Sequence, residues 1–240
     1  MFEVKWMYEF QHPQTYVTQL SKVVLKDYPS DVRILICDSG DYSIHEHICL
    51  LPNIKKLYTT NCNVPKHEKF QGIPYGTLQP QVDVVNTLDL PTHKERLAYC
   101  NFGTGSNRSR PGIWKHMLSK PFVLCEKLQH KAADCTDPKV LTAYWCQLAT
   151  SKFVICPPGN GPDTYRMWET LFAGSIPIVI NSPMIEHFTD DLPILAVGTY
   201  DNLTEEFLEQ EYERINSINY PKLFLQKQYW IDRWIQDLND

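Results

Sequence analysis

Short apolar runs alternate along the chain with segments in which apolar residues are spaced as in helices. The runs at residues 32–37 and Ile176–Ile180 are typical of strands that are buried on both faces of a parallel sheet. Residues 15–26 place Tyr16, Leu20, Val23 and Val24 on one side of a helix, so we expect a helix there. Strands that alternate with helices predict an α/β fold with mainly parallel sheets.

The predicted elements form two series, separated by residues 73–91, a segment with three prolines and little apolar periodicity. We therefore expect a first lobe over residues 1–80 and a second over residues 81–221, with the aromatic segment 222–240 packed back on the first lobe. Ligands of such sheets bind beyond the carboxyl ends of the strands, which predicts a site in the cleft between the lobes. The expected strands are residues 2–8, 54–60, 70–73, 96–102 and 153–156, and the expected helices are Arg110–Leu118 and residues 140–150, 164–173, 204–215 and 223–238.

Composition narrows the possible functions. The 23 basic and 28 acidic residues give a net charge of -5, which argues against general nucleic-acid binding but leaves room for a local phosphate pocket. No stretch reaches about 18 uninterrupted apolar residues, and the first ten residues mix charged with apolar side chains. The eight cysteines form no CxxC pair. We expect a cytoplasmic, soluble protein with reduced thiols and no zinc site.

Residues 151–180 carry the clearest chemical pattern: a strand, a glycine-bearing loop, a helix, a glycine stop and a second strand. Gly159 and Gly161 allow the backbone to approach a ligand closely. The loop leads into a helix whose free N–H groups and dipole favour an anion, and Asp163 or Thr164 can cap that helix.

Arg166 and Glu169 lie on one face of this helix. The planar guanidinium of an arginine suits a diphosphate, and a carboxylate one turn deeper can accept two ribose hydroxyl hydrogens. Together they predict a nucleoside-diphosphate site, although the spacing also fits an ordinary surface salt pair. The GxGxxG and Walker A patterns are both absent.

Residues 151–180 resemble the signature of exostosin-like glycosyltransferases, the family 47 group of inverting GT-B enzymes. That signature joins a Pro-x-Gly loop, an Arg-x-x-Glu helix and a Gly-x-Ile-Pro strand. The resemblance extends over about residues 33–190, through residues 36–41, Asn61, residues 73–76 and residues 97–110. The matching residues of the signature are Phe153, Pro158, Gly159, Asp163, Arg166, Glu169, Gly174, Ile176 and Pro177.

The resemblance implies a GT-B-like fold with two Rossmann-like lobes, of which the first is minimal and binds the acceptor. It implies inverting transfer of a sugar from a nucleotide sugar, expected to be UDP-linked, to a hydroxyl of a glycan, with no cofactor and no essential metal. Animal and plant members usually carry a membrane anchor and disulfides, so we expect a microbial or large-virus enzyme here. The alternatives are a non-catalytic nucleotide-sugar or glycan-binding module and a glycoside hydrolase, which would need two carboxylates across a sugar.

The base of an inverting transfer takes the acceptor hydroxyl proton. Asp41 is the first candidate and Asp38 the second, because both follow the strand at residues 32–37, although an Asp-Ser-Gly-Asp turn can also satisfy its own backbone. Arg110 is expected to be a second diphosphate contact, or else part of a solvated loop. The residues expected at the donor are Asn107, Arg110, Pro158, Gly159, Asp163, Arg166, Glu169 and His187.

Overall fold

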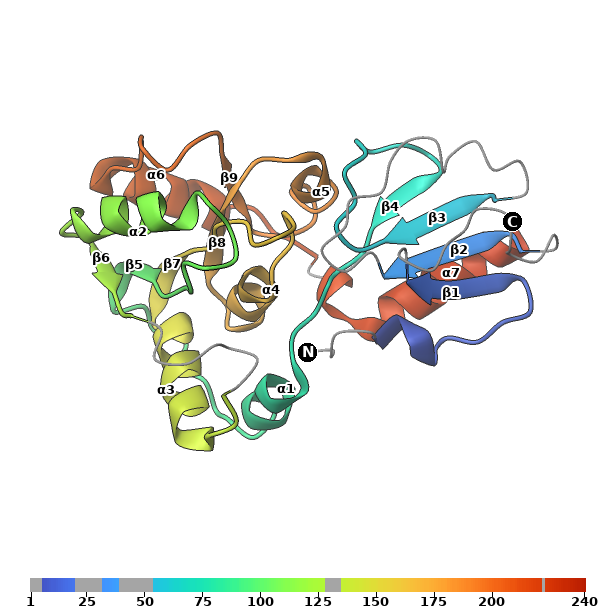
Figure 1. Ribbon diagram of the computed structural model, residues 1–240, viewed down its shortest axis with the longest axis horizontal. Coiled ribbons are helices and arrows are strands. Elements are labelled where there is room, and N and C mark those ends of the chain that lie inside the picture. The colour runs from blue at the N-terminus through green and yellow to red at the C-terminus, as the bar shows by residue number, and fades with distance from the viewer. Residues whose placement is uncertain (1–5, 20–31, 39–53, 128–134, 222) are drawn as a thin grey trace.

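A computed structural model describes residues 6–19, 32–38, 54–127, 135–221 and 223–240 of the protein. Two parallel sheets, each with its own helices, form two α/β lobes that lie side by side (Figure 1). The first sheet has four strands and the second has five, so the first lobe is the smaller. The predicted α/β class, with two parallel-sheet lobes and a minimal first one, is confirmed.

The first lobe is built on the strand order β1-β2-β3-β4, and each neighbouring pair is parallel. The predicted strand at residues 32–37 is β2, where Ile34, Ile36 and Cys37 are fully buried. The elements of this half are the 3-10 helix η1 (Trp6–Glu9), β1 (Thr15–Gln19), β2 (Ile34–Asp38), β3 (Lys56–Thr59), β4 (Phe70–Gly72) and the connecting helix α1 (Gln79–Val85).

The C-terminal helix α7 (Lys227–Asn239), which follows the 3-10 helix η5 (Leu223–Leu225), packs against this first sheet (Figure 1). The guanidinium of Arg33 donates to the carbonyl oxygen of Leu238 at 3.0 Å. The Trp234 ring stacks on Trp6, with 5.2 Å between ring centroids. The two ends of the described chain therefore meet in one apolar cluster.

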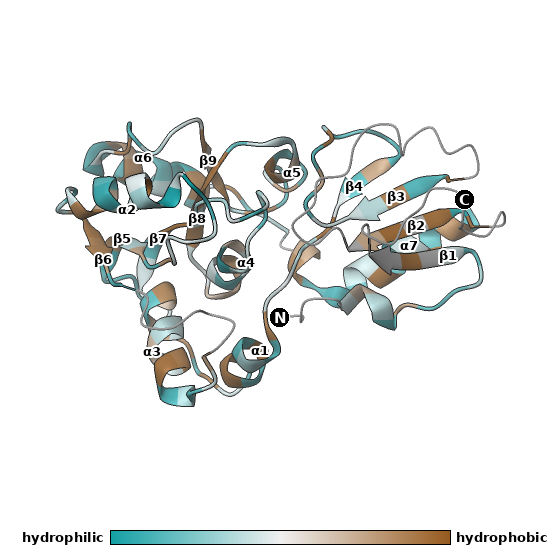
Figure 2. Ribbon diagram, in the orientation of Figure 1, coloured by the Kyte–Doolittle hydropathy of each residue, from teal (hydrophilic) through white to brown (hydrophobic). Residues whose placement is uncertain are grey.

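The second lobe has the strand order β6-β5-β7-β8-β9, again parallel throughout. Helices α3 and α4 contribute to the apolar cluster on one face of the sheet, and α2 and α6 to the cluster on the other. Figure 2 shows strand β2 of the first lobe in brown, the apolar colour, whereas helix α6 on the outside of the second lobe is mostly teal. The elements are β5 (Arg96–Cys100), α2 (Arg110–Leu118), β6 (Val123–Cys125), α3 (Pro138–Ala149), β7 (Ser151–Ile155), α4 (Tyr165–Phe172), β8 (Ile176–Ile180), α5 (Pro183–Glu186), β9 (Leu195–Val197) and α6 (Glu205–Asn216).

Two sequence predictions near the N-terminus are wrong. Residues 15–19 form strand β1 and not the start of a helix, because this stretch, which contains β-branched residues, pairs with β2. Residues 6–9 form a 3-10 helix instead of a strand, and the indole of Trp6 donates to the carbonyl oxygen of Pro74 at 3.2 Å. The linker contains helix α1, which has a proline in its first turn, where the missing N–H carries no cost.

Within the described ranges, no helix is both long enough and apolar enough to cross a membrane.

Candidate functional site

The predicted site lies where the carboxyl ends of β5 and β7 meet the amino end of α4. Residues 157–163 connect β7 to α4, and Asn101 follows β5 directly. The amide of Gly159 donates to the carbonyl oxygen of Gly161 at 2.9 Å, which closes the loop into a tight turn. The parallel strands therefore deliver the loop and the helix amino end to one edge of the sheet.

Arg110, at the start of α2, is buried and holds this loop in place. Its guanidinium donates to the carbonyl oxygens of Pro158 at 2.9 Å, Pro157 at 3.0 Å and Gly103 at 2.9 Å. Because these bonds take three of its five N–H groups, the first role that the geometry gives Arg110 is to position the loop.

Asn107 supports the same loop from the same side. Its side-chain amide donates to the carbonyl oxygen of Gly159 at 2.7 Å, and its oxygen accepts from the backbone and hydroxyl of Ser109. Arg108, between them in sequence, is exposed. Asn107 and Arg110, which the sequence placed at the donor, thus form hydrogen bonds with the loop that carries Pro158 and Gly159.

Arg166, in the first turn of α4, is a buried cation that forms no ion pair with a described residue. Its exposed fraction is 9%, and none of the ion pairs found among the described residues includes it. One guanidinium nitrogen lies 3.5 Å from the side-chain oxygen of Asn101, and Nε has no hydrogen-bond partner in the described part of the chain. The guanidinium carbon lies 5.8 Å from the ring centroid of Tyr144.

Glu169 is also buried, with an exposed fraction of 3%. One carboxylate oxygen accepts the hydroxyl of Thr77 at 2.5 Å, and the other accepts the hydroxyl of Tyr144 at 2.6 Å. Neither Arg166 nor Glu169 is on the surface, so the alternative of an exposed salt pair is wrong. The carboxylate receives two hydroxyl hydrogens, the same kind of donor that a ribose diol offers.

Two buried guanidinium groups therefore share this edge of the sheet. Burial and the nearby Arg166 charge lower the pKa of Arg110 to about 10, so Arg110 remains a cation at neutral pH. Burial would lower the pKa of Arg166, but the neighbouring Tyr144 and Glu169 outweigh it, and the pKa is raised. A site with two buried cations and one close carboxylate favours an anionic ligand.

A chain of hydrogen-bonded polar groups orients the side chain that faces Arg166. The amide of Asn101 donates to the hydroxyl oxygen of Tyr99 at 2.9 Å, and that hydroxyl donates to the carboxylate of Glu126 at 2.9 Å. Because the Asn101 amide is engaged in this way, its carbonyl oxygen is directed toward Arg166.

Asp163 joins the second lobe to the linker and to the first lobe. Its carboxylate accepts from the Trp168 indole at 2.6 Å and from the backbone N–H of Tyr75 at 3.1 Å. Its own backbone N–H donates to the side-chain oxygen of Asn61 at 2.9 Å. Burial raises the pKa of Asp163 to about 8, against the lowering effect of these N–H donors. The predicted cap of α4 therefore acts as an anchor between lobes.

The approach of Asn61 to the loop requires a glycine. A Cβ atom on Gly161 would lie 2.6 Å from the Asn61 side-chain oxygen, closer than two such atoms can approach. Asn61 itself has a positive φ of 49°, a conformation that asparagine tolerates better than most residues. Gly161 thus serves contact between the lobes.

His187, expected at the donor, is buried against the first lobe. Its Nε2 lies 2.9 Å from the carbonyl oxygen of Val64 and Nδ1 has no partner among the described residues. A Cβ on Gly72 would lie 3.1 Å from the His187 side chain. Burial lowers the pKa of His187, which favours the neutral ring.

The two candidate bases are Asp41 and Asp38. Asp41 lies outside the described residues. Asp38 is the last residue of β2, at the carboxyl end of that strand. Their catalytic roles stay predictions.

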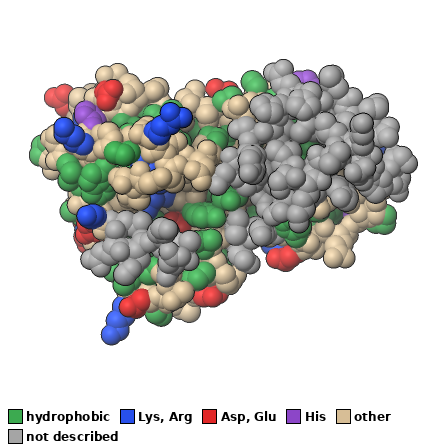
Figure 3. Space-filling model, in the orientation of Figure 1, with side chains coloured by type: hydrophobic (Ala, Val, Ile, Leu, Met, Phe, Trp, Pro, Cys, Tyr) green, Lys and Arg blue, Asp and Glu red, His purple; other side chains and the backbone are tan. Residues whose placement is uncertain are grey.

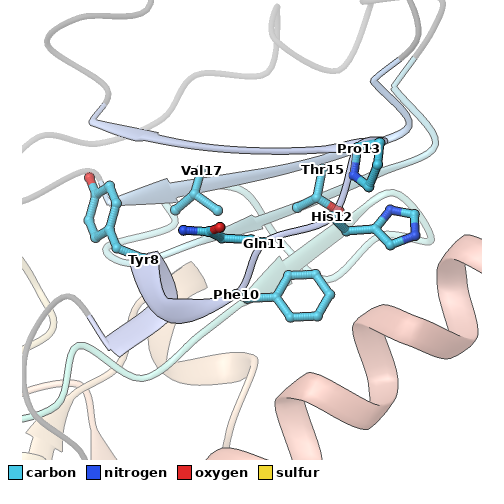
Figure 4. A pocket seen from close by; sticks show the side chains of 7 residues that line it. All are labelled: Tyr8, Phe10, Gln11, His12, Pro13, Thr15 and Val17. Atoms are coloured by element: carbon cyan, nitrogen blue, oxygen red, sulfur yellow. The ribbon is translucent and has the colours of Figure 1, made fainter.

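A pocket of about 500 Å³ opens in the first lobe (Figure 4). Its walls come from the end of η1, the turn that follows and strand β1. The pocket is lined by Tyr8, Phe10, Gln11, His12, Pro13, Thr15 and Val17.

In the face shown by Figure 3, the basic side chains are dispersed over the second lobe and form no single broad patch.

Three residues of the site, Asn101, Tyr144 and Thr77, were not predicted from the sequence, and they lie outside the loop and helix α4. Asn101 carried a usable signal, because it is a polar residue near the carboxyl end of the strand predicted at residues 96–102. Tyr144 lies in α3 and Thr77 in the linker, and neither has a local pattern that indicates contact with Glu169. In the described ranges, no group of three or more His, Cys, Asp or Glu residues is arranged to hold a metal.

Comparison with known proteins places these residues in a family. The model of the Exostosin GT47 domain matches residues 33–193. A probable glycosyltransferase of Arabidopsis thaliana is 36% identical over 73 residues, which are 29% of this chain and only 14% of that protein. The chain therefore matches about one seventh of that relative's length.

Among solved structures, the crystal structure of AviGT4, a glycosyltransferase involved in Avilamycin A biosynthesis, aligns with a TM-score of 0.41 and 9% identity. The alignment covers 87% of this chain and 73% of that one. The family model spans more than half of the chain and both lobes, including Arg110, Arg166 and Glu169. The chain therefore belongs to the Exostosin GT47 family.

Proposed function

We propose that the protein transfers a sugar from a nucleotide sugar, with UDP as the expected nucleotide, to a hydroxyl group of an acceptor glycan, with inversion at the sugar carbon. One observation carries the proposal: Arg166, a buried guanidinium without an ion pair among the described residues, lies at the amino end of α4 beside Glu169. A buried charge without a partner is costly, and a ligand anion would supply that partner.

Each part of the donor has a proposed contact. The N–H groups at the amino end of α4 and the guanidinium of Arg166 would bind the two phosphoryl groups. Glu169 would accept ribose hydroxyls in place of, or beside, those of Thr77 and Tyr144. Arg166 and Arg110 would stabilise the negative charge on the departing diphosphate, so we propose that no metal is needed.

The acceptor would approach from the first lobe, residues 1–80 together with residues 222–240, while residues 81–221 hold the nucleotide sugar. Asp41, or Asp38, would take the proton of the acceptor hydroxyl. The acceptor oxygen would bond to the sugar carbon as the bond to the diphosphate breaks on the opposite face. The pocket of Figure 4, with the aromatic rings of Tyr8 and Phe10, is the proposed acceptor contact.

The alternative is a module that binds a nucleotide sugar or a glycan without turnover. The first test is UDP release from a panel of UDP-sugars with glycan acceptors, with and without EDTA. Release that depends on the acceptor and survives EDTA supports a metal-independent transferase. UDP binding without release supports the binding module, and the absence of both rejects the nucleotide site.

Single substitutions assign the roles. Arg166→Ala should abolish UDP binding in calorimetry, whereas Arg108→Ala, an exposed arginine nearby, should not. Asp41→Asn should retain UDP binding and lose transfer, and unchanged turnover would reject Asp41 as the base.

A further inference from the structure

We infer that Cys100 and Cys125 form an oxidisable thiol pair that a peroxide closes into a disulfide, and that closure weakens ligand binding at Arg166. The two residues end the neighbouring strands β5 and β6 of the second sheet. They lie outside the contacts through which the proposed reaction would occur.

The geometry of the two strands places the thiols together. Cys100 and Cys125 are register partners in the parallel β5–β6 pair. Neighbouring strands lie about 4.8 Å apart, which is within the roughly 4.4–6.8 Å between the Cα atoms of disulfide-bonded cysteines. Both side chains pack on the same apolar cluster, on one face of the sheet.

The pair is asymmetric, as a reactive pair requires. Cys100 is fully buried, whereas Cys125 is partly exposed. The neighbouring Cys100 thiol lowers the pKa of the Cys125 thiol, although burial opposes this effect. Strand β6 is an edge strand of three residues, so a small inward shift can bring the sulfurs into bonding distance. Among the described cysteines, no other two are register partners.

The chemistry balances with a peroxide as the oxidant. The Cys125 thiolate attacks one peroxide oxygen, the O–O bond breaks, and the departing hydroxide is protonated to water. The sulfur of Cys100 then attacks the resulting sulfenic acid. The S–S bond forms, the S–O bond breaks, and a second water leaves. Two thiols lose two hydrogens and two electrons to one hydrogen peroxide.

Formation of the disulfide would affect ligand binding at Arg166 through the residues that follow the two cysteines in the sequence. Cys100 precedes Asn101, which faces Arg166, and Cys125 precedes Glu126. Tyr99 connects Asn101 to Glu126 by two hydrogen bonds of 2.9 Å each. Drawing β6 inward displaces Glu126 from this chain, so the orientation of Asn101 is lost. This consequence rests on the proposed function, whereas the disulfide itself does not.

The first experiment is intact-protein mass spectrometry of the full chain after hydrogen peroxide, with thiol-blocked peptide mapping. We expect a loss of about 2 Da and a linked 100–125 peptide. Cys125→Ser should prevent the link, and Cys146→Ser, a partly exposed cysteine on α3, should not. Addition of oxygen to Cys125 without a link, or a link between other cysteines, would overturn the thiol pair. Thermal unfolding checks that each variant is folded.

The second experiment is UDP calorimetry on the reduced and oxidised protein. We expect oxidised wild type to bind UDP about threefold more weakly or worse, with recovery after reduction and no effect in Cys125→Ser. Equal affinity in both states, with the disulfide present, would overturn the coupling and leave the pair in place. If even the reduced protein fails to bind UDP, the proposed function fails while the mass result still decides on the pair.

Discussion

The guanidinium of Arg166 stays charged although it is buried, because the neighbouring Tyr144 and Glu169 raise its pKa. It is buried beside Asn101 and the ring of Tyr144, and its Nε has no partner among the described residues. Arg110 is also buried but donates to three backbone carbonyls. One arginine is therefore available to a ligand, whereas the other is committed to the fold.

This contrast makes a prediction at the level of single residues. Arg166→Met should lower stability by less than about 1 kcal/mol, because the described residues give its guanidinium one hydrogen bond and no ion pair, although Tyr144 and Glu169 favour its charge. Arg110→Met should lower stability by about 1–3 kcal/mol, because three carbonyl groups lose their donor. Both variants should lose UDP affinity. Thermal melts with and without UDP measure this, and a large loss of stability in Arg166→Met would show that its role is structural.

Asp163 makes stability depend on pH. Its pKa rises from 3.8 in the unfolded chain to about 8 in the folded protein. Between these values the folded state holds a proton that the unfolded chain releases, so this residue makes stability fall as pH rises through that range.

The matching test compares wild type with Asp163→Asn, which cannot titrate. From about pH 5 to about pH 8, the wild-type melting temperature should fall more steeply than that of the variant. All other titrating groups are shared, so the difference between the two slopes reports on Asp163. Parallel slopes would contradict the raised pKa.

At the level of elements, Lys94 ties two helices together at the edge of the sheet opposite the site. Its ammonium group donates to the carbonyl oxygens of Ala149 at the end of α3, at 2.7 Å, and of Gly174 just after α4, at 2.8 Å. A cation at two helix carboxyl ends also interacts favourably with both dipoles. This contact helps to fix α3 beside α4, and with them the Tyr144 and Glu169 side chains.

We predict that Lys94→Met lowers the free energy of unfolding by about 1–3 kcal/mol. Lys115→Met, at an exposed position on α2, should change it by less than about 0.5 kcal/mol. Denaturant titration measures both. UDP affinity should be nearly unchanged in Lys94→Met at temperatures where it is folded, since Lys94 lies far from the carboxyl ends of the strands.

At the level of the whole molecule, the first lobe is completed by the last helix of the chain. Trp234 on α7 is fully buried and stacks on Trp6, and the hydroxyl of Tyr58 donates to the carboxylate of Asp237. A four-stranded sheet has too little apolar surface of its own for a stable core, so the helix supplies it.

Trp234→Ala should therefore lower stability by about 3–5 kcal/mol, as expected for an aromatic ring removed from a core. Its neighbour Ile235 is 45% exposed, and Ile235→Ala should cost less than about 1 kcal/mol. Denaturant titration followed by tryptophan fluorescence and circular dichroism measures both effects. Equal effects of the two substitutions would contradict the packing of α7 on the first sheet.

The local pattern of the chain was enough where an apolar run or a helical spacing is unambiguous over a few residues. Arg110–Leu118 and Ile176–Ile180 were predicted with the bounds that the structure shows, and Gly174, with a φ of 74°, ends α4 as expected. The helix expected from residue 15 was wrong because residues 15–19 form a strand. A strand takes its hydrogen bonds from a partner, here β2, which is distant in the sequence and so cannot be seen in the local pattern.

The same distinction holds for the site. Local sequence determined that Arg166 and Glu169 share one helix face at the end of a glycine loop, because helix periodicity and loop chemistry act over a few residues. Only the tertiary structure decided that both are buried, that Tyr144 and Thr77 donate to Glu169, and that Arg110 grips the loop. Burial and long-range hydrogen bonds depend on how distant segments pack, and that packing sets the electrostatics on which a charged ligand depends.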